Sequence, residues 1–323
     1  MTVRRRAIRR GAGFTLAACL LSGFASAGAV ADAASAMKAP PLLMNIDEFD
    51  RAKKTALLPN GITLGYAEFG DPAGPPLVLV HGYTDTARDW LPLVPYLPKS
   101  SHLILVDIRG HGRSSTPDCC YTRVDFAYDI KLLLDKLGIA RADIVGHSLG
   151  SIITQTFAEY WPERTRKVVL VSSTGGAAVC TPPGASPPKP SGMDFRSEIL
   201  KLKEPIDPES KFMVEWWASP TPVDAEFLRR QRRDAAAIPL KVWLAVLDQG
   251  LTGMDLQSTL PRLKAPTLLI WGAKDPIFGP EDRRTLQVGL PAARVIVYPD
   301  FGHNAFWEDP KRVARDLTEF LAE

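Results

Sequence analysis

Residues 143–161, DIVGHSLGSIITQTFAEYW, join a short apolar run to a longer amphipathic one. The first part has the composition of a buried strand, and the second carries apolar side chains at helical spacing. Gly146, Ser148 and Gly150 stand at the junction. Glycine loses much backbone freedom in regular structure, so alternate glycines are expected where a chain turns sharply. The stretch therefore predicts a strand, a tight turn and a helix, with a serine held at the turn.

Short apolar runs like the one that opens this stretch recur along the chain. Runs that are apolar on both faces are typical of parallel strands covered by helices on both sides. Helix-like stretches alternate with them, and residues 55–70 predict a hairpin with Asn60–Gly61 at its turn. This alternation predicts an α/β fold with a mostly parallel central sheet flanked by helices. The predicted strands are PLVLVHG (76–82), HLILVDI (102–108), ADIVGHS (142–148), KVVLVSS (167–173), PTLLIWG (266–272) and ARVIVYP (293–299), and the clearest helices are 123–139, 151–161 and 310–323.

The alternation stops in one segment, residues 177–262. It contains a proline-rich stretch, CTPPGASPPKP, followed by several helix-like pieces, so we expect a helical cap inserted into the α/β core. The sequence then divides into a signal peptide at 1–31, a linker at 32–50, a core at 51–176 and 263–323, and the cap at 177–262.

The N-terminus has the pattern of an export signal. Five arginines and no acidic residues lie in residues 1–31, and the uncharged stretch 11–31 ends in the small residues Ala29 and Ala31. We expect cleavage before Asp32 and a periplasmic or secreted protein. Two alternatives stay open: the stretch could span a bilayer, or LAAC could be a lipobox that anchors the chain through Cys19. The paired arginines also suggest twin-arginine export. We expect no membrane span in the mature chain.

The charge of the mature chain argues against nucleic-acid binding. The whole chain has 39 basic and 36 acidic residues, and removing the five N-terminal arginines leaves 34 against 36, a net charge of −2. No run of Lys and Arg with interleaved aromatic residues follows, so nucleic acid is excluded as a partner.

Three cysteines remain after export, Cys119, Cys120 and Cys180. An oxidising compartment permits disulfides, but the sequence leaves the pairing open. Cys119 and Cys120 could pair with each other, either could pair with Cys180, or all could be buried thiols. Their spacing does not resemble a metal site.

The serine at the turn suggests nucleophilic catalysis. GHSLG fits G-x-S-x-G, in which a strained turn projects the serine oxygen above the sheet. Ser148 needs a base, and His303 lies between the last predicted strand and the last helix. Asp275 follows an apolar run and would orient the base, whereas Asp300 is expected to be a turn residue. Ser148, Asp275 and His303 each follow a strand end, so they would meet at the carboxyl edge of the sheet. His111 and Asp107 are expected to stabilise a loop.

Five sequence segments together resemble those of the α/β-hydrolase fold superfamily, in its capped serine hydrolase branch. The resemblance extends from about Thr55 to Glu323. The segments are HGYTDTARDW, DIRGHGRS, GHSLGS, LLIWGAKDPI and FGHNAFWEDP. The resemblance implies a Ser148–His303–Asp275 triad that needs no cofactor and no metal. It also implies an oxyanion hole made by the backbone N–H groups of Tyr83 and Leu149, with His81 in a structural role.

The expected function is that of an exported serine esterase acting on a carboxylic ester or related acyl bond through an acyl-enzyme. The aromatic residues Trp216, Trp217, Trp243 and Phe212 either line an apolar substrate chamber under the cap or simply pack. The expected partner is a small-molecule acyl substrate of small or medium size, uncharged and apolar. The same triad also serves C–C bond hydrolases, lactonases, cofactor-free haloperoxidases and acyltransferases, and a non-catalytic ligand-binding member is a further alternative. The sequence leaves the oligomeric state open.

Overall fold

The computed structural model describes residues 38–176, 195–252 and 255–323. The predicted signal peptide, Cys19, Cys180 and the proline-rich start of the predicted cap lie outside the described residues. Within the described ranges, no helix has both the length and the hydropathy of a membrane span.

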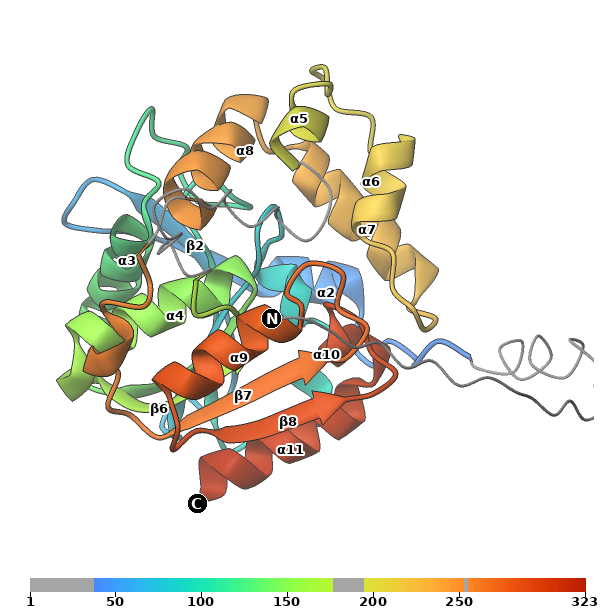
Figure 1. Cartoon of the computed structure of the whole chain (residues 1–323). Helices are drawn as coiled ribbons and strands as arrows, with labels where there is room; N and C mark the ends of the chain where they lie inside the picture. The colour runs from blue at the N-terminus through green and yellow to red at the C-terminus, as the bar shows by residue number, and fades with distance from the viewer. Residues whose placement is uncertain (1–37, 177–194, 253–254) are drawn as a thin grey trace, which may run out of the picture. The chain divides into compact units, whose positions relative to one another are not determined.

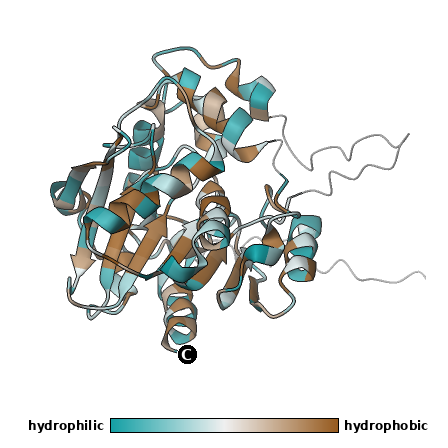
Figure 2. Ribbon diagram, turned by 90° about the vertical axis from the view of Figure 1, so that its left-hand side faces the viewer, coloured by the Kyte–Doolittle hydropathy of each residue, from teal (hydrophilic) through white to brown (hydrophobic). Residues whose placement is uncertain are grey.

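An eight-stranded sheet forms the core, as the apolar runs predict. Its order is β1-β2-β4-β3-β5-β6-β7-β8, with β1 and β2 antiparallel to their neighbours and the remaining pairs parallel. Figure 2 shows strands coloured mostly as hydrophobic and lying between helices. The predicted fold class is therefore confirmed. The strands are β1 (Lys53–Leu57), β2 (Thr63–Gly70), β3 (Pro76–Val80), β4 (His102–Asp107), β5 (Ala142–His147), β6 (Thr165–Val171), β7 (Thr267–Gly272) and β8 (Arg294–Tyr298).

Three predicted features of the core have simple local causes. The β1–β2 hairpin turns at Gly61, whose φ of 82° favours glycine. Helix α3 begins at a capping box between Thr122 and Asp125 and is followed by Gly138 at a φ of 70°. Helix α11 starts with Pro310 after its N-cap, Asp309.

Helices lie on both faces of the sheet (Figure 1). Helix α3 packs on α4, and α4 lies against β5 and β6. Helices α9 and α11 flank β7 and β8 in Figure 1. The sequence predicted α3, α4 and α11 but not α9 and α10. Their bounds are α3 (Arg123–Lys136), α4 (Leu149–Tyr160), α9 (Pro280–Gly289), α10 (Ala305–Glu308) and α11 (Pro310–Ala322).

Four helices occupy the described part of the segment between β6 and β7. They match the helix-like pieces of the expected cap, and α8 runs on into a π-helical turn, η4 (Leu247–Leu251). Figure 1 shows them at the top of the view, beyond the sheet. They are α5 (Phe195–Ile199), α6 (Lys211–Trp216), α7 (Ala225–Ala236) and α8 (Leu240–Val246).

The structure corrects the predicted linker and shows how two of the cysteines pair. The end of the predicted linker, 32–50, forms helix α2 (Ile46–Ala52), because Asn45 caps it and Phe49 is fully buried in the core. The linker therefore ends before α2. Cys119 and Cys120 form a disulfide bond with each other, which settles the pairing of these two cysteines.

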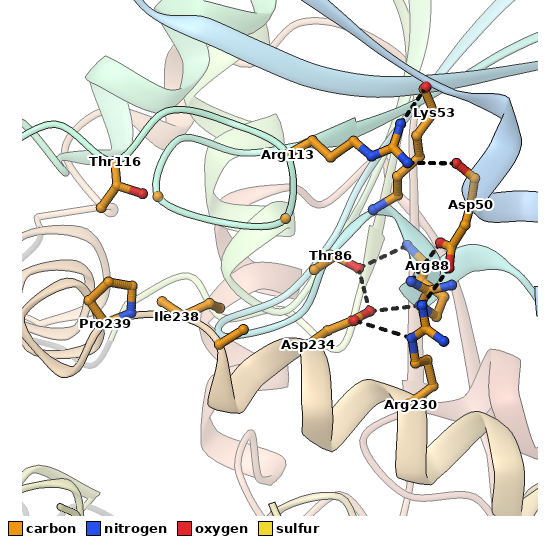
Figure 3. A pocket seen from close by; sticks show the side chains of 13 residues that line it. Asp50, Lys53, Thr86, Arg88, Arg113, Thr116, Arg230, Asp234, Ile238 and Pro239 are labelled. Atoms are coloured by element: carbon orange, nitrogen blue, oxygen red, sulfur yellow. Dashed lines mark hydrogen bonds and ion pairs between the residues drawn. The ribbon is translucent and has the colours of Figure 1, made fainter. Parts of the chain in front are cut away.

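A ring of four alternating charges ties helix α7 to the core (Figure 3). Arg88, on the 3₁₀ turn η1 (Ala87–Trp90), contacts Asp50 and Asp234 at 2.7 Å each. Arg230 contacts the same two carboxylates at 2.6 and 3.6 Å. Since each carboxylate bridges two guanidinium groups, α2, η1 and α7 are held together at one point beside a polar cavity of about 280 Å³.

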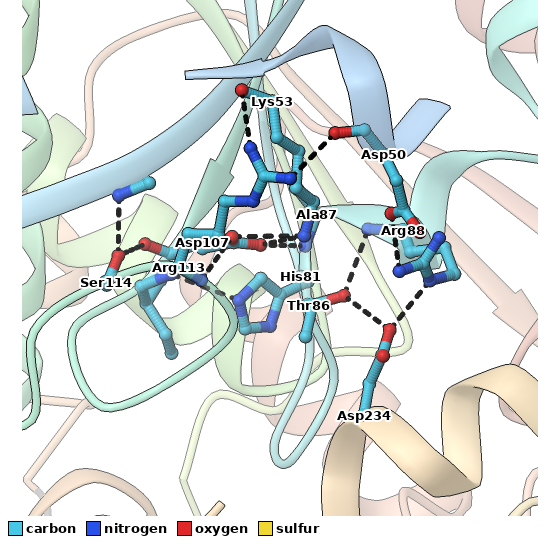
Figure 4. Close-up of polar contacts among 12 residues, drawn as sticks. Asp50, Lys53, His81, Thr86, Ala87, Arg88, Asp107, Arg113, Ser114 and Asp234 are labelled. Carbon is cyan, nitrogen blue, oxygen red and sulfur yellow. Dashed lines mark hydrogen bonds and ion pairs between the residues drawn. The ribbon is translucent and has the colours of Figure 1, made fainter. Parts of the chain in front are cut away.

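The fully buried Asp107 organises the loops around this ring (Figure 4). It accepts hydrogen bonds from the backbone N–H groups of Ala87 and Arg113 at 2.7 and 2.9 Å, and it pairs with Lys53 at 3.0 Å. Burial alone would raise the pKa of Asp107, but Lys53 and the two N–H groups outweigh burial and lower it. Asp107 therefore holds a loop, as expected from the sequence.

We predict that Asp107→Ala lowers the free energy of unfolding by about 3–5 kcal/mol, because it leaves the buried Lys53 ammonium without its carboxylate. Urea denaturation at neutral pH measures this loss. The stabilisation depends on the carboxylate, whose pKa is lower in the folded state. The difference from wild type should therefore shrink as the pH falls below about 4, near the ordinary pKa of aspartate.

Asp118→Ala is the matched control for this variant. Asp118 also pairs with a lysine, Lys241, but its side chain is 95% exposed. Its removal should leave the free energy of unfolding nearly unchanged, because solvent screens the exposed pair. Equal losses in the two variants would contradict the role given to Asp107.

The turn between β5 and α4 brings three backbone segments into contact. A Cβ atom at Gly146 would overlap the carbonyl oxygen of Gly150, and one at Gly150 would overlap the carbonyl oxygen of Val80. Backbone atoms cannot move aside as a flexible side chain can. The alternate glycines are therefore required by close approach of the backbone.

We predict that Gly150→Ala lowers the free energy of unfolding by about 3 kcal/mol or more, or prevents folding, because the added methyl group meets backbone. Gly279→Ala is the control, since nothing lies within 4 Å of its Cβ position and its φ is −82°. Thermal and urea unfolding compare the two. A Gly150→Ala protein as stable as the control would rule out this turn geometry.

Candidate active site

Ser148 occupies the turn after β5 in a strained conformation. Its φ of 51° and ψ of −118° are unusual for a residue with a side chain. Its N–H donates to the carbonyl of Val171 at 3.0 Å, and its own carbonyl accepts from the Ser151 hydroxyl at 2.5 Å. These contacts hold the backbone while the side chain stays 7% exposed at a cavity. The strain is of the kind found at functional sites.

His303 lies in the loop between β8 and α10, and its Nδ1 is 2.8 Å from Oδ2 of Asp275. The other oxygen of Asp275 accepts from the backbone N–H groups of Ile277 and Phe278 at 2.8 and 3.1 Å. Burial alone would raise the pKa of Asp275, but His303 and these two donors lower it on balance. Asp275 is thus a carboxylate that orients the His303 ring.

Asp300, the other acidic residue considered as a partner of His303, lies at the surface. It is 71% exposed and lies 3.5 Å from Lys274. The structure therefore brings Asp275, not Asp300, to His303.

A second histidine holds the backbone of His303. The carbonyl oxygen of His303 accepts from the Ser172 hydroxyl at 2.6 Å and lies 3.2 Å from Nε2 of His147. The other ring nitrogen of His147 is 3.2 Å from Oδ2 of Asp89. His147 therefore supports the loop that carries His303, and it lines the same cavity as Ser148.

Ser148 and His303 line one small cavity of about 30 Å³. Trp216 and Trp217 line it too, whereas Trp243 is fully buried and the Phe212 ring lies tilted against Trp216. Hence two of the four aromatic residues considered from the sequence reach the cavity and two pack behind it.

The two expected oxyanion donors lie beside Ser148. Leu149 is the first residue of α4, and the first N–H groups of a helix have no partner within it. Tyr83 lines the cavity in the loop after β3, with its hydroxyl donating to the carbonyl of Trp243 at 2.6 Å. The phenol is thus engaged elsewhere, and only the backbone of Tyr83 is suited to the expected role.

His81 and His111 are buried neutral side chains that hold loops. His81 donates from Nδ1 to the carbonyl of Gly82 at 2.8 Å and accepts the N–H of Ile108 at Nε2. Burial lowers the pKa of His81 to about 3 and that of His111 to about 4. Neither lines the cavity, in agreement with the structural roles expected from the sequence.

Asp85 is a site residue that the sequence analysis missed. It is 6% exposed, lines the cavity with Ser148 and His303, and accepts from the indole N–H of Trp217 at 3.0 Å. It belongs to the segment HGYTDTARDW, which the sequence analysis used only as evidence of the family resemblance. No local signal could have revealed it, because its partner Trp217 is 132 positions away.

In the part of the chain that the structure describes, one group of side chains has the composition of a metal site. Asp85, Asp89 and His147 offer ligand atoms within 4.8 Å of one another. All three are already engaged: Asp89 with His147 and the indole of Trp307, and Asp85 with Trp217. We therefore assign the cluster to the support of the site.

Curated relatives of the chain differ in activity. One is 29% identical over 81% of this chain and 67% of its own length, the dihydrolipoyllysine-residue acetyltransferase component of the acetoin cleaving system of Pseudomonas putida. A second, 31% identical over 76% of this chain and 87% of its own length, is 2-hydroxy-6-oxononadienedioate/2-hydroxy-6-oxononatrienedioate hydrolase of Paraburkholderia phymatum. A third, Lipase 3 of a Moraxella species, is 26% identical over 85% of this chain and 88% of its own length.

One family model covers most of the described chain. The model of the alpha/beta hydrolase family matches residues 77–316, from the start of β3 into α11. This range contains the turn at Ser148, the helices between β6 and β7, and the contact of Asp275 with His303. By sequence match and by strand order, the chain belongs to the alpha/beta hydrolase family.

Proposed function

We propose that this protein is a serine hydrolase that cleaves a carboxylic ester through an acyl-enzyme on Ser148. The observation that carries the proposal is that His303, fixed to Asp275 at 2.8 Å, lines the same cavity as the strained Ser148. A hydroxyl, a base and a group that orients the base are the minimum for activating a serine.

In this mechanism the Ser148 oxygen attacks the acyl carbonyl, and His303 takes its proton. Because Nδ1 of His303 is bound to Asp275, the proton goes to Nε2. Asp275 stabilises the imidazolium that forms. The N–H groups of Leu149 and Tyr83 receive the oxyanion. His303 then returns the proton to the leaving group, and a water molecule, activated in the same way, releases the acid.

The cavity indicates the charge of the acyl group. Trp216, Trp217 and Ile277 give it apolar walls. No Lys or Arg is among the described residues that line it. An uncharged acyl group therefore fits best.

The relatives weigh the alternatives differently. A dioate substrate, as in the name of the Paraburkholderia relative, carries two carboxylates, for which this cavity offers no cationic partner among the described residues. The lipase relative supports ester cleavage. The acetyltransferase relative favours a second candidate, transfer of the acyl group to an acceptor other than water. Product analysis with added alcohol or amine distinguishes the two.

Export through residues 1–31 is also part of the proposal, and N-terminal sequencing of the mature protein tests it.

We predict that Ser148→Ala lowers kcat/KM for p-nitrophenyl butyrate at least about 1,000-fold, because no other group replaces the nucleophile. A fluorophosphonate probe should label the wild type at residue 148, located by mass spectrometry, and should not label the variant. Thermal unfolding checks that the variant is folded. Unchanged turnover, or a label on another residue, would overturn the proposal.

A second prediction follows from the aromatic wall of the cavity. At constant pH, kcat/KM should be highest for p-nitrophenyl acetate or butyrate and at least about tenfold lower for the octanoate, since Trp216 and Trp217 bound the described part of the cavity. Rates are compared below the critical micelle concentration of the octanoate. Faster cleavage of the octanoate would exclude the small acyl site.

A further inference from the structure

Strand β8 is the last strand of the sheet and has a neighbour on one side only, β7 (Figure 1). The carbonyl oxygen of Tyr298 accepts from the N–H of Ala273 at 2.8 Å, so the backbone groups of Tyr298 face β7. These groups alternate in direction along a strand, and those of Val295 and Val297 therefore face away from β7. Within the described ranges, no loop or side chain hydrogen-bonds to the backbone of either valine.

This edge lacks the features that commonly keep edge strands from pairing, which are an exposed Lys, a Pro within the strand or a bulge. Strand β1, at the opposite edge, carries Lys54, whose side chain is 59% exposed. Strand β8, RVIVY, contains neither Lys nor Pro and pairs with β7 in unbroken register. Its one charged side chain, Arg294, is held within the chain by Glu323 at 2.7 Å.

The side chains beside the free backbone groups are apolar. Val295 and Val297 are 38% and 43% exposed. Tyr298 is buried and donates to Asp316 on α11, so its side chain points to the face of the sheet that α11 covers. Because successive side chains of a strand point to opposite faces, the two valines lie on the other face. Exposed β-branched side chains next to unpaired backbone groups favour the addition of another strand.

A second copy of β8 fits this edge in the antiparallel direction. With Ile296 opposite Ile296 of the second copy, Val295 of each copy stands opposite Val297 of the other. Each such pair exchanges two hydrogen bonds. Shifted registers involve Pro299, which has no N–H, or Ala293, whose N–H already donates within the chain. The register centred on Ile296 therefore uses the free groups of both valines fully.

The position of α11 relates this register to the charges of the helix. Arg294, at the start of β8, contacts Glu323 beyond the last turn of α11. Tyr298, at the end of β8, has the Arg312 guanidinium near the start of α11 over its ring, 4.8 Å from the ring centroid. The strand and the helix therefore run in opposite directions. A two-fold axis through Ile296, perpendicular to the sheet, passes near the middle of α11 and places the two copies of this helix antiparallel on one face.

The charges of α11 are complementary about this axis. Arg312 and Arg315 lie in its first half, whereas Glu319 and Glu323 lie in or beyond its second half, and all four are exposed. Asp316, between them, is held by a hydrogen bond within the chain. The axis therefore sets the basic half of each α11 against the acidic half of the other. Such self-complementarity is what a symmetric pairing of identical surfaces requires.

We propose that the β8 edge is the dimerisation surface of this protein. Two copies of β8 pair antiparallel about a two-fold axis at Ile296, and this pairing joins the two eight-stranded sheets into one. The partner is a second copy of this chain, because both the free hydrogen-bonding groups of β8 and the charges of α11 match their own image across the axis.

Sedimentation velocity of the full chain over a series of concentrations gives the first test. We expect a species of about twice the 35.3 kDa of one chain, whose population rises with concentration. A single-chain mass that persists up to about 0.1 mM, where even an association of micromolar affinity is complete, overturns the inference.

The double variant Val295→Lys/Val297→Lys locates the surface. It sets lysine opposite lysine in both cross-strand pairs, so the dissociation constant of the dimer should rise at least about tenfold. Thr55→Lys/Leu57→Lys is the matched control, since it adds two exposed lysines at the same spacing to the opposite edge, on β1. The control should sediment as wild type does. Thermal unfolding checks that both variants are folded.

Should the double lysine variant not fold, Val297→Pro replaces it. This change removes an N–H that faces away from β7 and leaves the pairing with β7 in place. A dimer that is as stable in the β8 variant as in wild type, or one that the β1 control weakens equally, overturns the inference.

Cross-linking tests the register in a Cys19→Ser/Cys180→Ser background. Opposite residues of the pair centred on Ile296 have Cα atoms about 4.5 Å apart, within reach of a disulfide. Ile296→Cys should therefore form covalent dimers under mild oxidation. Val295→Cys should not, because the two copies of residue 295 are diagonal neighbours more than about 7 Å apart. Absence of cross-linking at residue 296, or equal cross-linking of the two variants, overturns the inference.

Discussion

The sharp turn at Ser148 is the constraint on which the site depends. The turn is possible because Gly150 has no side chain where its backbone approaches the carbonyl of Val80 on β3. Gly146 likewise has no side chain where its backbone approaches the carbonyl of Gly150. The serine is thereby held at a positive φ, and its N–H is tied to β6 through Val171. The strained conformation is stabilised by neighbouring strands, so the position of Ser148 depends on the sheet.

The sheet also fixes His303 from several directions. His303 follows β8, its partner Asp275 follows β7, and the Ser172 hydroxyl that holds its carbonyl follows β6. His147, at the end of β5, supports the same carbonyl. Because the carboxyl ends of parallel strands meet at one edge, a loop without regular structure can still hold an imidazole in one orientation.

Charged side chains maintain the loop between β3 and η1, where Tyr83 and Asp85 lie. Asp107 anchors η1 through the N–H of Ala87, and the ring of Asp50, Arg88, Asp234 and Arg230 ties η1 to α2 and α7. Because Arg88 is buried, removing Asp50 or Asp234 would deprive a buried guanidinium of one of its two carboxylate partners. Helix α7 also brings Gln231 to Asp85, so the position of this helix affects both stability and the chemistry of the cavity.

Local patterns in the sequence determined the strands, the hairpin at Gly61 and the helices α3, α4 and α11. They also determined the choice of Ser148, Asp275 and His303 as candidate site residues. Strand ends and glycine turns can be predicted in this way because they are encoded by neighbouring residues. They missed α2, α9 and α10, which are short or whose apolar positions are few, and they left Cys119 and Cys120 without a settled pairing. Only the tertiary structure decided that His147 and Ser172 hold the carbonyl of His303, and that the indole of Trp217 donates to Asp85. Contacts between segments more than a hundred residues apart depend on how separate elements pack, and no periodicity within either segment records them.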